Sequence, residues 1–176
     1  MKPIEVLGLS VEATGRSPIL LLRERDAPHR VLPIFIGGQE ALAIASALSG
    51  ASPPRPLTHD LLAALVEELD AQVDHVEVTE VRDGTFVADL AVRGPSGGVS
   101  LDSRPSDAIA LALRLDAPLF ASDAVLEEAG TTVSIRAADD VIDENVTQFR
   151  EFLDEVDPTE FETRRGPDEP PDERRE

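Results

Sequence analysis

The first third of the chain alternates apolar and polar side chains in the manner of β-strands. The alternation runs over residues 4–11 and changes parity near Gly8, which predicts a strand with a bend or bulge at that point. Apolar runs at 19–22 and 31–36 predict two more strands. Because proline cannot donate a backbone hydrogen bond, Pro33 places the third strand at a sheet edge or at a bulge.

After residue 37 the apolar pattern takes on a helical period. Residues 40–48, closed by Gly50, predict a first helix, and the proline-rich stretch 52–56 predicts an extended connector. Thr58 is a suitable N-cap for a second helix. An apolar stripe at helical spacing should pack one face of this helix on the core, and it consists of Leu61, Leu62, Leu65, Val66 and Leu69.

The middle of the chain predicts a β-hairpin followed by a buried helix. The alternating segments around Val78 and Phe86 are joined by Asp83-Gly84, a strong hairpin turn, and a short strand follows at 99–102. A third helix at 108–115 is apolar on nearly every side, so we expect it to be the central buried helix. Residues 118–120 should be briefly extended, and a short helix should run from Ser122 or Asp123 to Gly130.

The chain should end in a peripheral helix and an acidic tail. Residues 142, 146, 149 and 153 are apolar at helical spacing, whereas the residues after Asp157 are mostly charged or proline. We therefore expect one compact α/β (α+β) domain over 1–155, with helices packed on a mixed or antiparallel sheet, and a disordered acidic tail over 156–176. The edge strand with Pro33 and the helix with Phe149 and Phe152 predict apolar surface that a homo-oligomer would cover.

The charge balance narrows the choice of partners. The formal net charge is −19, from 35 acidic against 16 basic residues, and Lys2 is the single lysine. A field of this sign repels phosphate backbones, so nucleic-acid binding would have to be local. An acidic surface almost without lysine is also expected where molar salt screens charges, and halophilic adaptation predicts unfolding on dialysis to low salt. An arginine-preferring genome is the alternative explanation.

Other absences in the sequence exclude several kinds of site. The chain has no cysteine, which rules out disulfides, thiolate metal sites and a cysteine nucleophile. No apolar run approaches the roughly 20 residues that cross a bilayer, and the N-terminus lacks the apolar stretch of a signal peptide. We expect no membrane partner and a cytoplasmic location.

Two segments that resemble each other are the candidate sources of chemistry. In 55–60 (RPLTHD) and 104–107 (RPSD), an Arg-Pro pair precedes a hydroxyl residue and an acid at a predicted helix start. Thr58 and Ser106 are natural N-caps, and an acid near a helix N-terminus is stabilised by the helix dipole, so a purely structural role is one interpretation. The functional interpretation takes the polar groups at these element ends as a site.

The functional interpretation assigns a role to each candidate. Glu40, Asp102 and Asp107 could hold a divalent cation whose bound water attacks a phosphodiester, although no diagnostic ligand spacing is present. Arg55 and Arg104 would bind phosphate. His59 would relay a proton, with Asp60 as a further catalytic candidate. Asp102 and Arg104 could instead form an ion pair that fixes the junction between strand and helix.

Four segments carry a resemblance to a known family. In order and spacing the chain resembles the bifunctional nuclease (BFN) domain family over roughly residues 3–155, through IGGQEA at 36–41, RPLTHDLL at 55–62, DGTF at 83–86 and DSRPSDAIALA at 102–112. The chain departs from the common pattern at Ser103 and Val87. The resemblance implies a compact, self-associating α/β domain with DNase or RNase activity, and it brings no established catalytic residues.

The sequence therefore predicts a nuclease that hydrolyses the phosphodiester bonds of DNA, RNA or both, with a divalent cation as a possible cofactor and nucleic acid as its partner. The alternative is a non-catalytic oligomeric module that binds a small anionic ligand or a protein partner. In that case the same polar groups serve as helix caps and buried ion pairs.

Overall fold

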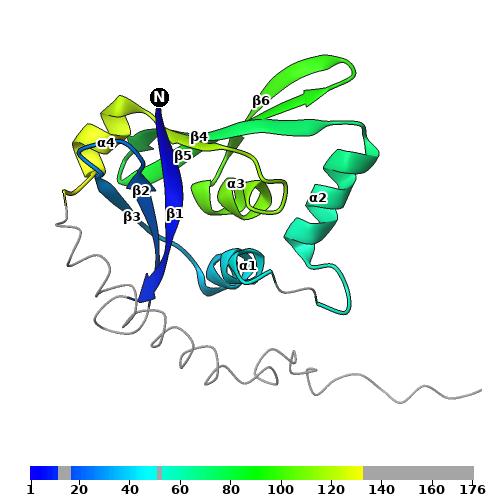
Figure 1. The fold of residues 1–176 in the computed structure, drawn as a ribbon, viewed down its shortest axis with the longest axis horizontal. Helices are drawn as coiled ribbons and strands as arrows, with labels where there is room; N and C mark the ends of the chain where they lie inside the picture. The colour runs from blue at the N-terminus through cyan, green and yellow to red at the C-terminus, as the bar shows by residue number, and fades with distance from the viewer. Residues whose placement is uncertain (12–16, 51–52, 133–176) are drawn as a thin grey trace, which may run out of the picture.

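The computed structural model describes residues 1–11, 17–50 and 53–132. Within these ranges one seven-stranded sheet carries four helices (Figure 1), which confirms the predicted α+β fold. In chain order the elements are β1 (Lys2–Val11), β2 (Pro18–Glu24), β3 (Val31–Phe35), α1 (Gly38–Leu48), α2 (Thr58–Glu68), β4 (Gln72–Arg82), β5 (Thr85–Gly94), β6 (Gly97–Ser103), α3 (Pro105–Ala112), β7 (Leu119–Ala121) and α4 (Asp123–Ala129).

The sheet is built from two antiparallel meanders joined by a short strand. Its strand order is β3-β2-β1-β7-β4-β5-β6, so β7 lies in the middle. It pairs antiparallel with β1 through Ile4 and Leu119 and parallel with β4 through Val76 and Leu119. The sequence predicted an extended piece here but did not reveal that these three residues connect the two halves of the sheet.

Local signals for turns and edges are confirmed. The register between β1 and β2 shifts between Val6 and Gly8, where the change of parity predicted a bulge. The strand that contains Pro33 lies at one edge of the sheet. Asp83 and Gly84 both have positive φ, 50° and 75°, as a two-residue type I′ hairpin turn requires.

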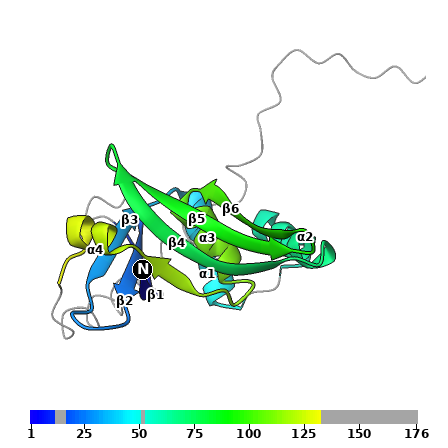
Figure 2. The ribbon, with the colours of Figure 1, turned by 90° about the horizontal axis from the view of Figure 1, so that it is seen from above.

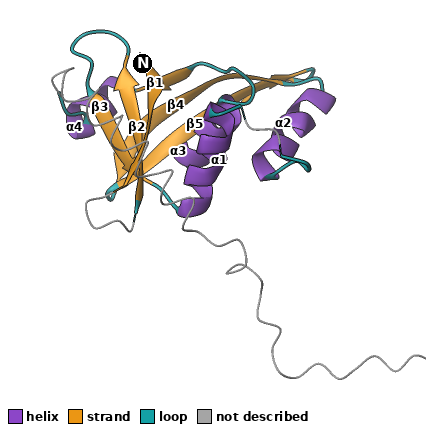
Figure 3. Ribbon diagram, turned by 60° about the horizontal axis from the view of Figure 1, so that its bottom comes forward, coloured by secondary structure: helices purple, strands orange, loops and turns teal. Residues whose placement is uncertain are grey.

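Helix α3 is the buried centre of the molecule, as predicted. Every residue from Pro105 to Ala112 except Asp107 is buried, and the helix contacts β4, β5, α1 and α2. Figure 2 and Figure 3 show α1 and α3 together on one side of the sheet. Ile109 and Leu111 belong to the same core cluster as Ile44 of α1 and Val76 of β4.

Helix α2 does not pack as predicted. Its leucines point outward: Leu61, Leu65 and Leu69 are 65%, 52% and 62% exposed, while Ala63 is the residue buried against the rest of the protein. A stripe of apolar residues reveals that a helix has an apolar face but does not say whether that face meets the core. We call the exposed group the leucine face, which consists of Leu57, Leu61, Leu62, Leu65 and Leu69.

Two predictions fall outside the described residues: the helix around 142–153 and the acidic tail at 156–176. Of the helices that the structure does describe, none combines the length and the apolar character that crossing a membrane requires.

Candidate functional site

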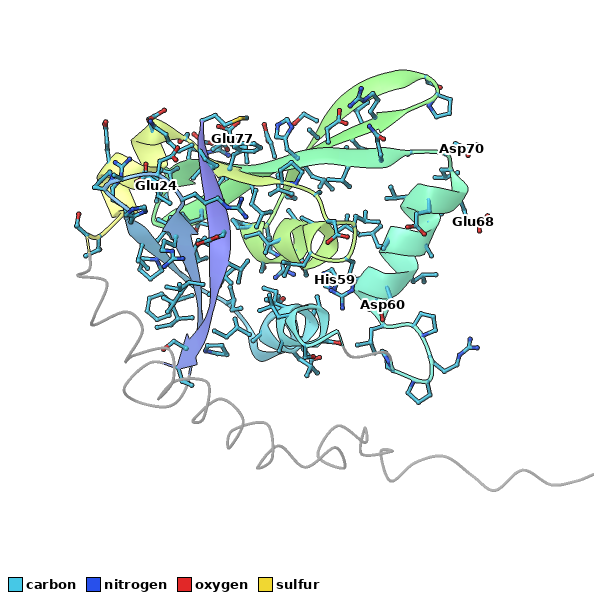
Figure 4. The ribbon with its side chains drawn as sticks, viewed as in Figure 1. Glu24, His59, Asp60, Glu68, Asp70 and Glu77 are labelled. Atoms are coloured by element: carbon cyan, nitrogen blue, oxygen red, sulfur yellow. The ribbon has the colours of Figure 1, made fainter. Side chains whose placement is uncertain are left out.

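The starts of three helices meet at one pocket. Glu40 lies in the first turn of α1, His59 in the first turn of α2 and Asp107 in the first turn of α3. Figure 4 shows His59 projecting from the start of α2 toward α1 and α3. The pocket has a volume of about 540 Å³ and is lined by the polar residues Gln39, Glu40, Thr58, His59, Arg104 and Asp107 and by Leu42, Ala43, Pro56 and Leu57.

A continuous row of charged contacts crosses this pocket. Arg104 places Nη1 2.9 Å from Oε1 of Glu40, and its Nε donates to Oδ2 of Asp107 at 2.7 Å. The other carboxylate oxygen of Asp107 lies 3.4 Å from Nε2 of His59. Arg104 is 66% exposed, whereas Glu40 and His59 at the two ends of the row are 18% and 15% exposed, so the row is open to solvent at Arg104. It links α1, α3 and α2 in that order.

Arg104 is held by both acids at once. The carboxylate of Asp107, and after it that of Glu40, raises the pKa of the guanidinium, which therefore stays a cation at any ordinary pH. Because its side chain is largely exposed, the guanidinium can exchange one of these carboxylates for another anion at small cost.

Gly37 shapes the position of Glu40. It is the N-cap of α1, and a methyl group added at Gly37 would collide with the carboxylate of Glu40. The absence of a side chain at Gly37 thus leaves room for that carboxylate to fold back over the helix start. The sequence showed a glycine pair before a helix but gave no sign of this contact.

Asp60 lies in the same first turn as His59 but does not line the pocket. Its Oδ1 accepts from Nε of Arg114 at 2.5 Å, and its Oδ2 accepts the backbone N–H of Leu57 at 2.8 Å. Arg114, and then this N–H, lower the pKa of Asp60. Nη1 of Arg114 also donates to the carbonyl oxygens of Ala43 and Ala110, at 3.1 and 2.7 Å. The pair therefore ties α2 to α1 and α3.

Sequence reasoning missed Arg114. Its side chain is 9% exposed and stands just after the most apolar helix of the chain. A charged residue in such surroundings needs a partner, so its position next to this helix was a usable signal. That signal would have separated Asp60 from the other acids.

The structure does not bring Asp102 to the pocket. Asp102 lies on β6 opposite Asp89 of β5 and is exposed. The ion pair between Asp102 and Arg104, which was the alternative interpretation, does not form, because Arg104 turns to Glu40 and Asp107 instead. The pleat gives the reason: Leu101 lies opposite the core residue Leu90, so Asp102 points to the other face of the sheet.

The position of Arg55 and the N-caps of α2 and α3 also differ from the predictions. Arg55 is exposed in the connector before α2 and forms no ion pair with any residue that the structure describes. The N-caps of α2 and α3 are Leu57 and Arg104, not Thr58 and Ser106. In α3 the reason is Pro105, whose fixed φ suits the first helical position. The helix therefore begins at Pro105, before Ser106.

In the described part of the chain, the candidate acids Glu40, Asp102 and Asp107 are not gathered into one metal centre. Among the described residues, no group of three or more His, Asp or Glu side chains is placed to hold a metal ion. Glu40 and Asp107 both bind Arg104, and Asp102 faces away from them. The donor set at this pocket therefore fits an anion held by Arg104 better than a cation.

The sequence matches a family model and several known proteins. A family model described as the bifunctional nuclease domain matches residues 20–134. An uncharacterised protein of Mycobacterium tuberculosis (strain ATCC 25618 / H37Rv) is 39% identical over 165 residues, which cover 92% of this chain and 98% of its own length.

Plant relatives are more distant. Bifunctional nuclease 1 of Arabidopsis thaliana is 29% identical over 105 residues, 58% of this chain and 32% of the plant protein. Bifunctional nuclease 2 of Oryza sativa subsp. japonica is 23% identical over 115 residues, 64% of this chain and 35% of the plant protein. This chain thus spans about a third of each plant protein.

Proposed function

Since the chain belongs to the bifunctional nuclease domain family, we propose that it hydrolyses phosphodiester bonds of nucleic acids at the pocket between α1, α2 and α3. The names of the plant relatives, bifunctional nucleases, support the reaction class, and the pocket supports the location of the site. The proposal assigns direct roles to Glu40, His59, Arg104 and Asp107.

The convergence of three helix N-termini carries this proposal. Each N-terminus holds unpaired backbone N–H groups and the positive end of a helix dipole, which together attract anions. Arg104 adds a full positive charge at the same place. These groups provide the local attraction for phosphate that a chain with net charge −19 otherwise lacks.

In the proposed binding step a phosphate group replaces a carboxylate on Arg104. Arg104 faces both Glu40 and Asp107, and its guanidinium can bind two phosphate oxygens side by side. Glu40 is the carboxylate we expect to be displaced, because Asp107 also contacts His59. Arg55, exposed beside Pro56 of the pocket wall, would contact a neighbouring phosphate of the same strand.

His59 is the proposed proton acceptor. Its Nε2 faces Asp107, which favours the tautomer with the proton on Nε2 and leaves Nδ1 to accept a proton. As an attacking water forms its bond to phosphorus, His59 takes the water's proton and Arg104 stabilises the charge on the phosphate oxygens. The leaving oxygen takes a proton from solvent at the open mouth of the pocket, and His59 later returns its proton to solvent.

The test compares two histidines. We expect the wild-type protein to cleave single- or double-stranded DNA or RNA at high salt, and His59→Gln to lose about 100-fold or more of that rate. His75→Gln is the matched control, because His75 lies on β4, edge-on to Phe120, and does not line the pocket. Arg104→Gln should weaken substrate binding as well as cleavage.

Each result distinguishes the nuclease from a binding module. No cleavage of any of the four substrates, with or without magnesium or manganese, would reject the nuclease function. Binding of a phosphate anion that Arg104→Gln abolishes, without cleavage, would instead favour the non-catalytic module. Equal loss of cleavage in His59→Gln and His75→Gln would place the chemistry elsewhere.

A further inference from the structure

A second pocket adjoins the candidate pocket at Arg104. It lies where the end of β3, the N-cap of α1, the turn between β4 and β5 and the first turn of α3 come together, and its volume is about 360 Å³. Pockets for small molecules have volumes of about 300–1,000 Å³, so the space can hold a ligand. Arg104 lines both pockets, so a phosphate held by its guanidinium borders each of them.

Two of the chain's six aromatic side chains line this second pocket. Phe35, the last residue of β3, is 62% exposed, and Phe86 of β5 is partly buried against the core. Ile34 and Ile36 line the pocket beside Phe35. Nucleobases bind by stacking on such rings, and any base can stack because every base has a π-face. The lining therefore suits a flat aromatic ligand.

Ser106 gives the second pocket a hydroxyl group that the fold does not use. The sequence marked Ser106 as a natural N-cap, but Arg104 takes that position and Ser106 is the second residue of α3. Ser106 is 6% exposed, lines the second pocket and forms no side-chain hydrogen bond with any residue that the structure describes. A buried hydroxyl normally has a partner, because leaving one unpaired is costly. The Ser106 hydroxyl is thus available to a ligand in this pocket.

The two pockets match the two ends of one nucleotide. A nucleotide carries its phosphate and its base on opposite sides of a sugar. The candidate pocket gathers charged groups around Arg104, whereas the described lining of the second pocket has rings, a hydroxyl and no charged side chain other than Arg104. Because Arg104 borders both pockets, a phosphate bound there places the attached sugar next to the second pocket.

We propose that the second pocket binds one nucleobase of the strand whose phosphate is held by Arg104. The base stacks on Phe35, and the Ser106 hydroxyl forms a hydrogen bond with the edge of the base. Since a hydroxyl can donate or accept, it serves all four bases, and we expect little preference among them. This base pocket rests on phosphate binding at Arg104 in the proposed function and adds the base to what that site recognises.

The chemistry of the lining argues against other occupants. An inorganic anion would use Arg104 and leave the rings of Phe35 and Phe86 without a role. An apolar peptide would use the rings but would bury the guanidinium of Arg104 and the hydroxyl of Ser106 without partners, which is costly. A nucleotide satisfies all of these groups, because its phosphate pairs with the guanidinium and its base with the rings and the hydroxyl.

The first test compares two ligands that differ only in the base, adenosine 5′-monophosphate and ribose 5-phosphate. Calorimetric titration of the full-length chain at high salt measures both affinities without requiring cleavage. Because stacking on aromatic rings strengthens binding, we expect the wild type to bind the adenosine nucleotide about 10-fold tighter or more. Phe35→Leu should remove most of this preference and leave the affinity for ribose 5-phosphate unchanged.

Phe120→Leu is the matched control for the loss of a ring. Phe120 lies on β7, edge-on to His75, and does not line the second pocket. This variant should keep the preference of the wild type for the nucleotide. Arg104→Gln should instead weaken the binding of both ligands, because both carry the phosphate.

Ser106→Ala removes the hydroxyl alone. We expect it to bind adenosine 5′-monophosphate about 5-fold more weakly, as the loss of one hydrogen bond predicts, and ribose 5-phosphate as before. The melting temperature should not fall, because the hydroxyl has no partner among the described residues and alanine favours a helix. A lower melting temperature with unchanged nucleotide binding would overturn the role of Ser106.

The second test uses cleavage of two oligonucleotides of the same sequence, one of which carries a single abasic residue. We expect the wild type to cut next to the abasic residue about 10-fold more slowly than at the same position of the intact strand. Phe35→Leu should cut the two strands at nearly equal rates at that position. Phe120→Leu should keep the difference that the wild type shows.

The outcomes separate the base pocket from the proposed function. A preference for the nucleotide that Phe35→Leu removes, in a protein that cleaves no nucleic acid, would support the base pocket and reject the nuclease. Equal cleavage of intact and abasic strands, with equal affinity for the two ligands, would overturn the base pocket and leave the nuclease function standing. The absence of any nucleotide binding would also overturn it, as would an equal loss of preference in Phe35→Leu and Phe120→Leu.

Discussion

The two Arg-Pro segments start two helices whose first-turn acids make different contacts. In α3 the arginine itself is the N-cap and Asp107 is the third helical residue, and in α2 Leu57 is the N-cap and Asp60 is the third helical residue. The acids therefore occupy equivalent positions. Asp60 binds a backbone N–H and the nearly buried Arg114, whereas Asp107 binds the exposed Arg104 and contacts His59.

The surroundings of the two helices account for the difference. Helix α3 is buried at every position except Asp107, so its first turn is held rigidly while this acid faces the pocket. Helix α2 covers little of the core, and the pair between Asp60 and Arg114 is what attaches its start to α1 and α3. The same local sequence thus provides an ion pair that attaches the helix in α2, through Asp60, and a candidate functional group in α3, Asp107.

The largest expected effect contrasts a leucine from each helix. Leu111→Ala in α3 should lower the free energy of unfolding by about 2–5 kcal/mol, because it leaves a cavity in a fully buried site. Leu65→Ala in α2 should cost under about 1 kcal/mol in a chain held monomeric by dilution, since half of that side chain is in solvent. Urea unfolding measures both. A cost above about 2 kcal/mol at Leu65 would show that α2 packs on the core after all.

The next effect contrasts the two acids. Asp60→Asn should lower the free energy of unfolding by about 2 kcal/mol, because it leaves the buried guanidinium of Arg114 without its charged partner. Asp107→Asn breaks a pair with an exposed arginine and should cost at most about 1 kcal/mol while reducing cleavage. Unfolding curves and cleavage rates of the two variants, measured together, test this. The reverse ranking would exchange the roles of the acids.

A smaller effect appears on acidification. Arg114 lowers the pKa of Asp60 below its usual 3.8, so the stability that this pair provides is complete above pH 3.8 and is lost as the pH falls through the lowered pKa. The difference in urea midpoint between wild type and Asp60→Asn should therefore shrink below pH 3.8.

Glu24 offers an independent comparison away from the pocket. It is 1% exposed and paired with Arg30, whose hydrogen bonds lower the pKa of Glu24 below 4.5. Glu24→Gln and wild type should likewise converge as the pH falls below that value. Differences that stay constant down to pH 2 would mean that neither carboxylate is stabilised in its charged form.

The smallest effect concerns residues that belong to neither helix. Truncation after Asp157 removes a charged, proline-rich stretch that can bury little apolar surface. The melting temperature and the sedimentation of the shortened chain should match those of the full chain. A melting temperature lower by several degrees would show that the removed residues dock on the folded part.

Much of the fold could be predicted from local patterns in the sequence. The bulge near Gly8, the edge position of Pro33, the Asp83-Gly84 turn and the buried helix at Pro105–Ala112 each follow from a few neighbouring residues. Such features depend on the period of the side chains and on the backbone freedom of glycine and proline, both of which are written in the sequence.

The sequence by itself determined which segments form helices and which acids stand near their starts, because helix propensity acts over a few residues. It did not determine the N-caps of α2 and α3, which are Leu57 and Arg104. Tertiary structure alone decided that Glu40, His59, Arg104 and Asp107 share a pocket, that Asp102 faces the other side of the sheet, and that the leucines of α2 face outward. Those outcomes depend on contacts between residues far apart in the chain, up to the 71 positions that separate Arg114 from Ala43. No local sequence pattern specifies which distant side chain a residue will contact in the folded protein.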